Sequence, residues 1–211
     1  LNQSLQIAGD NSLEIKKAMS SVPLNHSKGM QWLITHMPAE DLKNVKAEFL
    51  LLNSNIAHQA MENTKWGQEI PDDLFFSYVL PYANLNETVE SWRLDFFNKF
   101  YPMVKDMQSA YDAVVFLNQK IFDELGVIYS TKRPKADQSP YESINAGMAS
   151  CTGLSILLID VCRSVGIPAR FVGTPSWYNN SGNHSWVEIW DGEWHFTGAA
   201  EPTEDRLNES W

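Results

Sequence analysis

The 211-residue sequence has no long apolar run and a deficit of basic residues. A transmembrane helix needs about 18 or more consecutive apolar residues, and no such stretch occurs. Lys and Arg number 16 against 26 Asp and Glu, giving a formal net charge of −10. Nucleic-acid-binding proteins normally show a basic patch, and anionic membranes attract basic segments. The composition therefore argues against nucleic acid and against a membrane as the main partner.

Cysteine is also scarce, with only Cys151 and Cys162. A chain of this length can bury a sizeable core without disulfide bonds. The two cysteines are expected on one helix, about 16 Å apart along its axis, whereas a disulfide needs Cα atoms within about 7 Å. Both thiols are therefore expected to be reduced, and Cys162 is expected in the core. Without a histidine cluster the pair also makes a poor metal site, so no metal and no cofactor are predicted.

The sequence lacks an initial methionine and a charged-then-apolar signal segment, which indicates a processed or trimmed chain. Its eight tryptophans and many Asn-Ser or Asn-Thr pairs suit an exported protein. We expect a bacterial protein of the periplasm or cell surface. The chain ends at Trp211, soon after the last motif described below, which leaves open further domains in a longer protein.

The first half of the chain has helical periodicity. Apolar residues recur three and four apart after Pro38, which predicts one amphipathic helix over 39–63. On that helix His58 is interpreted as a packed or solvated residue rather than a ligand, because it has no clustered partners. The helix expected at 87–100 and the residue after it carry a stripe of aromatic residues: Trp92, Phe96, Phe97, Phe100 and Tyr101. This stripe is interpreted as core packing, with a surface that binds substrate as the alternative. The expected helices are one within 1–29, followed by a turn, and others at 39–63, 71–81, 87–100 and 109–125.

The second half changes to alternating helix and strand patterns. Residues 127–129 form a short strand-like run, and a polar segment then leads to an apolar helix ending at Gly166. A strand is expected at 169–172, a polar loop at 174–183 and a clear strand at 184–190. Asp191-Gly192 predicts a two-residue hairpin turn, from which 193–197 returns antiparallel. The expected core is thus a helix beside an antiparallel sheet.

Cys151 stands at the start of the apolar helix. Apolar positions 154, 157, 158, 161, 162 and 165 fall on one stripe, and Gly166 with Pro168 forms a stop signal. Ser150 or Thr152 is expected to cap the N-terminus. Free backbone N–H groups there favour a thiolate, which suits a nucleophile. The alternative is a buried structural cysteine, which is the commoner role for this residue type.

A cysteine nucleophile needs a base, and the base needs a third group to orient it. His184 begins the strand after the polar loop. A two-residue turn at 191–192 would set His184 opposite Ala199, with Glu201 and Thr197 as its diagonal neighbours on the same face. A carboxylate holds an imidazole better than a hydroxyl, so Glu201 is the favoured third residue. His195 is expected on the same face and is interpreted as solvated or structural.

Two segments together resemble the transglutaminase-like superfamily of the papain-like clan: AGMASCTGLSILLIDVCRSVGIPARFV and NHSWVEIWDGEWHFTGAAEP. The matching features are Gly-x-x-x-Cys at 147–151, Arg-x-x-Gly-Ile-Pro-Ala-Arg at 163–170 and His-x-Trp-Val-Glu at 184–188. The stretch 71–93 also resembles the helical preface of bacterial members. The resemblance implies an α+β fold, with a cysteine helix packed on an antiparallel sheet. It divides the chain into a helical N-terminal region, 1–108, and a catalytic core, 109–211.

The resemblance implies a Cys151 nucleophile and a His184 base acting on an amide or peptide bond, with hydrolysis favoured. Glu201-Pro202 resembles the closing Asp-Pro of the family, displaced by about three residues; either Gly198 permits a bulge that brings Glu201 back, or the triad is incomplete. Asn145 and then Tyr141 are candidate oxyanion donors beside the Cys151 N–H.

The expected substrates are protein, peptide or peptidoglycan-type amides. Two alternatives stay open. One is a true cross-linking transglutaminase. The other is a catalytically degenerate module that binds peptide or glycan through Trp177, Tyr178 and Trp186.

Overall fold

The computed structural model describes residues 1–178 and 182–209. The predicted loop 174–183 thus includes residues 179–181, which lie outside the described residues. The helices of the first half are α1 Asn2–Ala8, α2 Ser12–Ser21, α3 Ser27–His36, α4 Ala39–Asn44, α5 Ala47–Asn63, α6 Asp72–Tyr78 and α7 Arg93–Val104. The later elements are α8 Ala110–Leu125, β1 Ile128–Tyr129, α9 Pro140–Ala146, β2 Met148–Ala149, α10 Cys151–Ser164, β3 Ala169–Thr174, β4 His184–Trp190 and β5 Trp194–Thr197.

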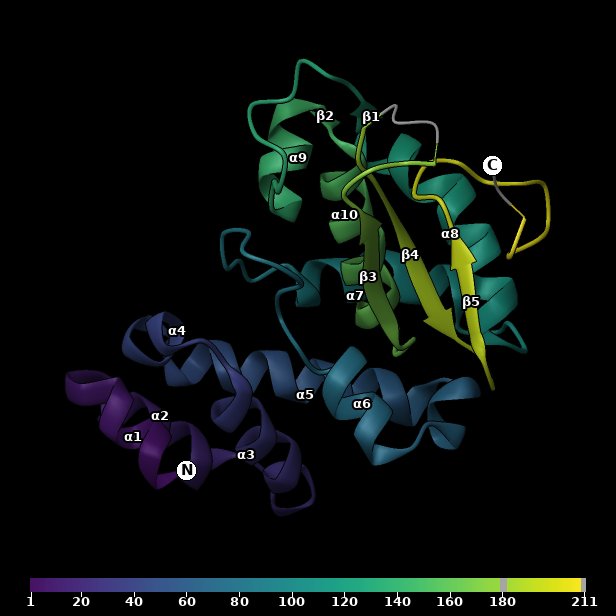
Figure 1. Ribbon diagram of the computed structural model, residues 1–211. Helices are drawn as coiled ribbons and strands as arrows, with labels where there is room; N and C mark the ends of the chain where they lie inside the picture. The colour runs from purple at the N-terminus through teal and green to yellow at the C-terminus, as the bar shows by residue number, and fades with distance from the viewer. Residues whose placement is uncertain (179–181, 210–211) are drawn as a thin grey trace.

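The helices α1 to α6 gather on one side of the molecule, away from the sheet (Figure 1). They share one hydrophobic cluster, while a second cluster contains α8, α10 and residues of β3 and β4. Helix α7 belongs to the second cluster through Phe96, Phe100 and Val104, and Phe97 meets α5 in a third. The aromatic stripe of α7 is therefore largely core, as expected. The division of the chain at residue 108 stays a prediction. The packing places α7, which precedes this boundary, in the same hydrophobic cluster as the later half of the chain.

The single helix predicted over 39–63 is wrong, because the chain is extended at Val45 and Lys46. The buried side chain of Asn11 donates to the carbonyls of Leu42 and Val45, at 2.9 and 2.8 Å. Glu14 accepts the Ala47 N–H at 2.8 Å. These contacts satisfy groups that a continuous helix would bond internally, so tertiary structure overrides the local pattern.

Helix α7 starts at Arg93, not at Glu87 as predicted, and continues past Phe100 to Val104. Glu87 instead accepts the backbone N–H groups of Asn84 and Leu85, at 2.6 and 2.8 Å. The carboxylate thus organises a loop in place of a first helical turn.

Three helices were not predicted: α3, α9 and one of the pair α1 and α2, since only one helix was expected within 1–29. Helix α9 carries a capping box in which Ser139 and Glu142 bond each other's backbone N–H groups. Ser139-x-x-Glu142 with Pro140 at the first helical position is a sequence signal for a helix start, so α9 was within reach of sequence reasoning. In α3, Gly29 is buried inside the helix. The sequence alone does not show that a helix continues through this glycine, because its tertiary packing is what favours the helix there.

Helix α10 packs against the three-stranded antiparallel sheet, in strand order β3-β4-β5 (Figure 1). Its predicted bounds and its stop at Gly166, where φ is +77°, are confirmed. Ser185, Val187 and Ile189 of β4 are buried, while the alternate residues are half-buried. The sheet therefore covers α10 with one face and leaves the other, which carries His184 and Trp186, partly open.

The predicted two-residue hairpin turn is wrong, because Trp190 pairs with Trp194. The connection is therefore three residues long, and Asp191 at its start accepts the Tyr111 N–H of α8 at 3.2 Å. A shift of one residue exchanges the faces of a strand. Accordingly His195 pairs with the buried Ile189 and lies on the opposite face from His184, contrary to expectation.

Among the described residues, no helix combines the length and the apolar character that crossing a membrane requires.

Candidate functional site

Cys151 is the first residue of α10, as the sequence predicts, and its side chain is half-buried. Of the two predicted capping residues, Ser150 takes the role, since its hydroxyl accepts the Gly153 N–H at 3.1 Å. The same hydroxyl donates to the Ala136 carbonyl, at 2.5 Å, which fixes the turn before the cysteine. Free N–H groups in the first turn give Cys151 a positive electrostatic environment.

Strand β4 passes beside this end of α10. Ser185, the residue after His184, is buried, and its hydroxyl oxygen lies 3.9 Å from Cys151 Sγ. The Thr152 hydroxyl lies 3.2 Å from the same oxygen. These contacts set the start of β4, where His184 lies, against the N-terminus of α10. Two segments 33 residues apart in sequence are thereby joined at the site.

Glu201 reaches His184 by a route that the sequence did not predict. The paired strands end at Val187 and Thr197, and a tight turn follows in which the Glu201 N–H donates to the Gly198 carbonyl at 3.1 Å. Glu201 Oε2 then lies 3.7 Å from His184 Nε2. The expected proximity of the two side chains is thus present, through a turn rather than a bulge and without His184 standing opposite Ala199.

This acid–histidine pair is partly exposed to solvent, with side-chain exposures of 20% for His184 and 49% for Glu201. The 3.7 Å separation allows ion pairing but is longer than a hydrogen bond. Thr197, the alternative third residue, is buried and accepts a hydrogen bond from Asn118. Glu201 is therefore the better placed of the two candidates.

Aromatic rings surround His184 on the open face of the sheet. The Trp177 ring lies 5.3 Å from the His184 ring in an edge-on arrangement, and the Trp186 ring lies 6.3 Å from it. Tyr178 is 88% exposed and packs against Trp177. The three predicted substrate-binding aromatics are therefore brought together beside the histidine, where Trp177 shields one side of the imidazole.

The two candidate oxyanion donors lie on α9. Asn145 is exposed there, beside a shallow surface hollow that Pro134 and Lys135 also line. The Tyr141 hydroxyl donates to Asp95, and its ring packs against Phe96. Burial, together with Asp95, raises the pKa of Tyr141. This contact weighs against Tyr141 as an oxyanion donor, and the role of Asn145 stays a prediction.

Cys162 provides the contrast to Cys151 within the same helix. It is completely buried, and burial raises the pKa of its thiol. Both cysteines are free thiols in the structure. The core position predicted for Cys162 is confirmed, and only Cys151 has access to solvent.

Two buried arginines, Arg93 and Arg163, hold α10 in place through hydrogen bonds to neighbouring segments. Burial, then the neighbouring Arg163, lowers the pKa of Arg93 to about 9. Both arginines donate to backbone carbonyls of the 78–83 segment, among them Pro81. They therefore tie the N-terminal helices to the far end of α10 from Cys151.

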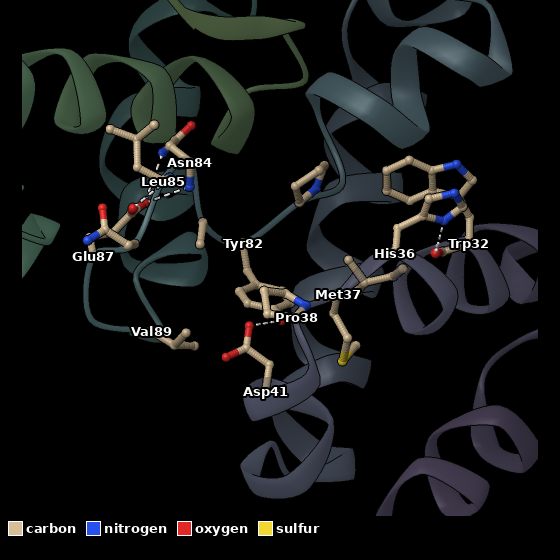
Figure 2. Close-up of a pocket in the computed structure, with 14 residues that line it drawn as sticks. Trp32, His36, Met37, Pro38, Asp41, Tyr82, Asn84, Leu85, Glu87 and Val89 are labelled. Carbon is tan, nitrogen blue, oxygen red and sulfur yellow. Dashed lines mark hydrogen bonds between the residues drawn. The ribbon is translucent and has the colours of Figure 1, made fainter. Parts of the chain in front are cut away.

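A cavity of about 410 Å³ lies between α3, α4 and the loop 81–89. Figure 2 shows Asp41 bonded to Tyr82 on one wall, with Trp32 stacked on His36 at another side. Its lining includes neither Cys151 nor His184 nor Glu201. The cavity is thus separate from the cysteine site.

Sequence reasoning missed Asn118 and Ser185. Asn118 lies on the apolar stripe of α8 with Val114, Leu117 and Ile121, and a polar residue on such a stripe is a usable signal. Ser185 is the unspecified position of the His-x-Trp motif. Nothing in the sequence indicated that its hydroxyl would lie near Cys151.

Comparison with known proteins gives one family and one solved structure. A model of the transglutaminase-like superfamily matches residues 101–198. A crystal structure named "Putative Cysteine Protease" from Cytophaga hutchinsonii aligns with 19% identity and a TM-score of 0.50. The alignment covers 67% of this chain and 46% of that one, so this chain spans less than half of that structure's length. A search of curated proteins found no match.

These comparisons confirm the predicted fold class. The fold is α+β, a papain-like and transglutaminase-like core in which the cysteine helix packs on an antiparallel sheet, with a helical N-terminal region. At 19% identity, the likeness to the solved structure concerns the fold alone.

Proposed function

Residues 101–198 belong to the transglutaminase-like superfamily, and from this premise we propose that the chain is a cysteine enzyme that transfers acyl groups from amide or peptide bonds. Cys151 is the nucleophile, His184 the general base and Glu201 the residue that orients it. The observation that carries the proposal is the meeting of α10 and β4, where Cys151 Sγ lies 3.9 Å from the residue that follows His184.

The first step forms a bond between Cys151 Sγ and the carbonyl carbon, while His184 takes the thiol proton. The oxyanion accepts the Cys151 N–H, with Asn145 as a second proposed donor. The C–N bond then breaks, and His184 returns its proton to the departing amine. A thioester remains on Cys151, which water or another amine resolves with His184 again as base.

Hydrolysis is the favoured outcome, and cross-linking to an amine is the second. The proposed substrates are proteins, peptides or peptidoglycan-type amides, and the proposed location is the bacterial periplasm or cell surface. The open aromatic surface of Trp177, Tyr178 and Trp186 supports binding of an extended chain beside His184, because aromatic rings offer large contact area at low entropic cost.

Iodoacetamide labelling of the native protein, from about pH 5 to about pH 9, tests the nucleophile. Cys151 is expected to react at least tenfold faster near neutral pH than an ordinary exposed thiol, and His184→Ala is expected to remove that advantage. Cys162 is an internal control in every sample, because it is buried and should react only on unfolding. An ordinary rate for Cys151 sinks the proposal.

The reaction type needs a second experiment, with a library of peptides and muropeptides incubated alone or with a fluorescent primary amine. Mass spectrometry then separates cleaved products from amine adducts. Cys151→Ala is the control for both. Adducts in preference to cleavage would favour the cross-linking alternative.

A non-catalytic binding module is the second candidate function. The separation of 3.7 Å between Glu201 and His184, and the 49% exposure of Glu201, favour it. In that case Cys151 would label slowly while peptide or glycan binding, followed by tryptophan fluorescence, would survive Cys151→Ala and fall on Trp177→Ala.

A further inference from the structure

Helix α8 contributes one buried polar side chain to the region of the site, Asn118. It is 3% exposed, although it lies on a stripe of apolar residues that packs against the sheet. A buried amide is costly unless its donors and acceptor are bonded. The partners of Asn118 therefore show what its burial achieves.

All three of its hydrogen bonds go to one short segment. Nδ2 donates to Thr197 Oγ1 at 3.0 Å and to the Gly198 carbonyl at 2.9 Å. Oδ1 accepts the Ala200 N–H at 3.0 Å. Both the amide nitrogen and the amide oxygen of Asn118 therefore bond the turn that immediately precedes Glu201.

The turn is one that would not form readily by itself. Ala200 has φ +62°, a left-handed conformation that residues other than glycine rarely adopt. Such a conformation persists where surrounding contacts hold it, and the bond from the Ala200 N–H to Asn118 is one of them. The turn then aims Glu201 Oε2 at His184 Nε2, 3.7 Å away.

We propose that Asn118 is a positioning residue for the site: it holds the turn 197–201 so that Glu201 meets His184. The inference rests on the proposed function, since it assigns to Asn118 an effect exerted only through Glu201. It also explains how an acid displaced along the sequence from its usual place still reaches the histidine. Asn118 itself touches neither Cys151 nor substrate.

A double-mutant cycle tests this with iodoacetamide as the probe. The variants are Asn118→Ala, Glu201→Gln and the double variant, and the readout is the Cys151 alkylation rate near neutral pH. Glu201→Gln is expected to lower the rate about three- to fivefold, and Asn118→Ala by a similar factor. The double variant should be no slower than Glu201→Gln, because both changes remove the same contact.

Asn11→Ala is the matched control, since Asn11 is another buried asparagine that bonds two backbone carbonyls, far from the site. It should lower the melting temperature without changing the Cys151 rate. If Asn118→Ala does not fold, Thr197→Val removes one of the three bonds with little change of shape. It should slow Cys151 two- to threefold and show the same non-additivity with Glu201→Gln.

The outcomes separate the two proposals. If Glu201→Gln and His184→Ala leave the Cys151 rate unchanged, the proposed function fails. If Glu201→Gln slows Cys151 but Asn118→Ala and Thr197→Val do not, only the role of Asn118 is overturned. The same holds if the losses from Asn118 and Glu201 multiply, which indicates that Asn118 acts through general stability.

Discussion

Replacing Gly198 by alanine should displace the one carboxylate oxygen that faces His184. A Cβ at position 198 would lie 2.3 Å from Glu201 Oε2 and 2.9 Å from Glu201 Cβ. Ordinary contact begins at 3.4 Å, so the oxygen has to move by about 1 Å. It starts 3.7 Å from His184 Nε2, already at the limit of useful attraction. The variant should therefore behave as if Glu201 were lost.

The expected effect on the site is a loss of about three- to fivefold in the Cys151 alkylation rate near neutral pH, since a partly exposed ion pair is worth about 0.5 to 1 kcal/mol. The expected effect on stability is about 1–2 kcal/mol, because the flexible end of Glu201 can move away, whereas the 2.9 Å contact with Glu201 Cβ requires a small shift of the turn itself. Alkylation kinetics and urea unfolding measure the two quantities on the same sample.

Gly126→Ala is the control, because a Cβ at Gly126, unlike one at Gly198, would meet no atom within 4 Å, while the backbone there has φ +67°. It should destabilise the fold through backbone strain and leave Cys151 unchanged. The reasoning is refuted if Gly198→Ala keeps the full alkylation rate, or if Gly126→Ala slows Cys151 as much. In either case the position of Glu201 does not control the cysteine.

Three further changes have distinct expected outcomes. The Ser185 hydroxyl accepts the Cys151 S–H at 3.9 Å and would donate a weak hydrogen bond to the sulfur once the thiol is ionised, so Ser185→Ala should slow Cys151 alkylation two- to threefold; an unchanged rate would make Ser185 a packing residue. Ser150→Ala should cost about 1–2 kcal/mol in urea unfolding, since the cap of α10 is removed, whereas Ser20→Ala on the surface of α2 should cost almost nothing. Burial lowers the pKa of His58 from 6.5 to about 4. The folded state thus favours neutral His58, so the free energy of unfolding is highest above about pH 6.5 and falls by about 2 kcal/mol toward pH 4 as the unfolded state takes up a proton at this position. His58→Gln should make the fall of the unfolding free energy with pH less steep, and an equally steep fall contradicts the assignment.

The local signals along the chain were strongest where one surface is fully buried. The helix that follows Cys151 repeats apolar residues on a single stripe and ends at glycine, so its bounds and its cap were predictable. The strand that begins at His184 alternates cleanly, and its bounds were also predicted. Cys151 and His184 stand at the starts of these two elements, and the sequence motifs around them already indicated their pairing.

The third residue shows where such reasoning ends. The Asp-Gly pair predicts a two-residue turn, yet Asp191 bonds the start of α8 and the connection gains one residue, which changes the register of the whole hairpin. Similarly, Asn11 divides the predicted helix 39–63 through contacts 31 and 34 residues away. Local propensity cannot include such partners, because they are distant in sequence.

The sequence by itself determined the cysteine helix, the histidine strand and the α+β class, because the periodic pattern of buried residues and the turn residues depend only on positions close together in the sequence. Only the tertiary structure decided that Glu201 reaches His184. That outcome depends on a left-handed Ala200, on a glycine with no room for a Cβ and on a buried asparagine from α8. The asparagine lies 79 to 82 residues from its partners in the sequence, which is the physical reason that the route by which Glu201 reaches His184 could not be predicted.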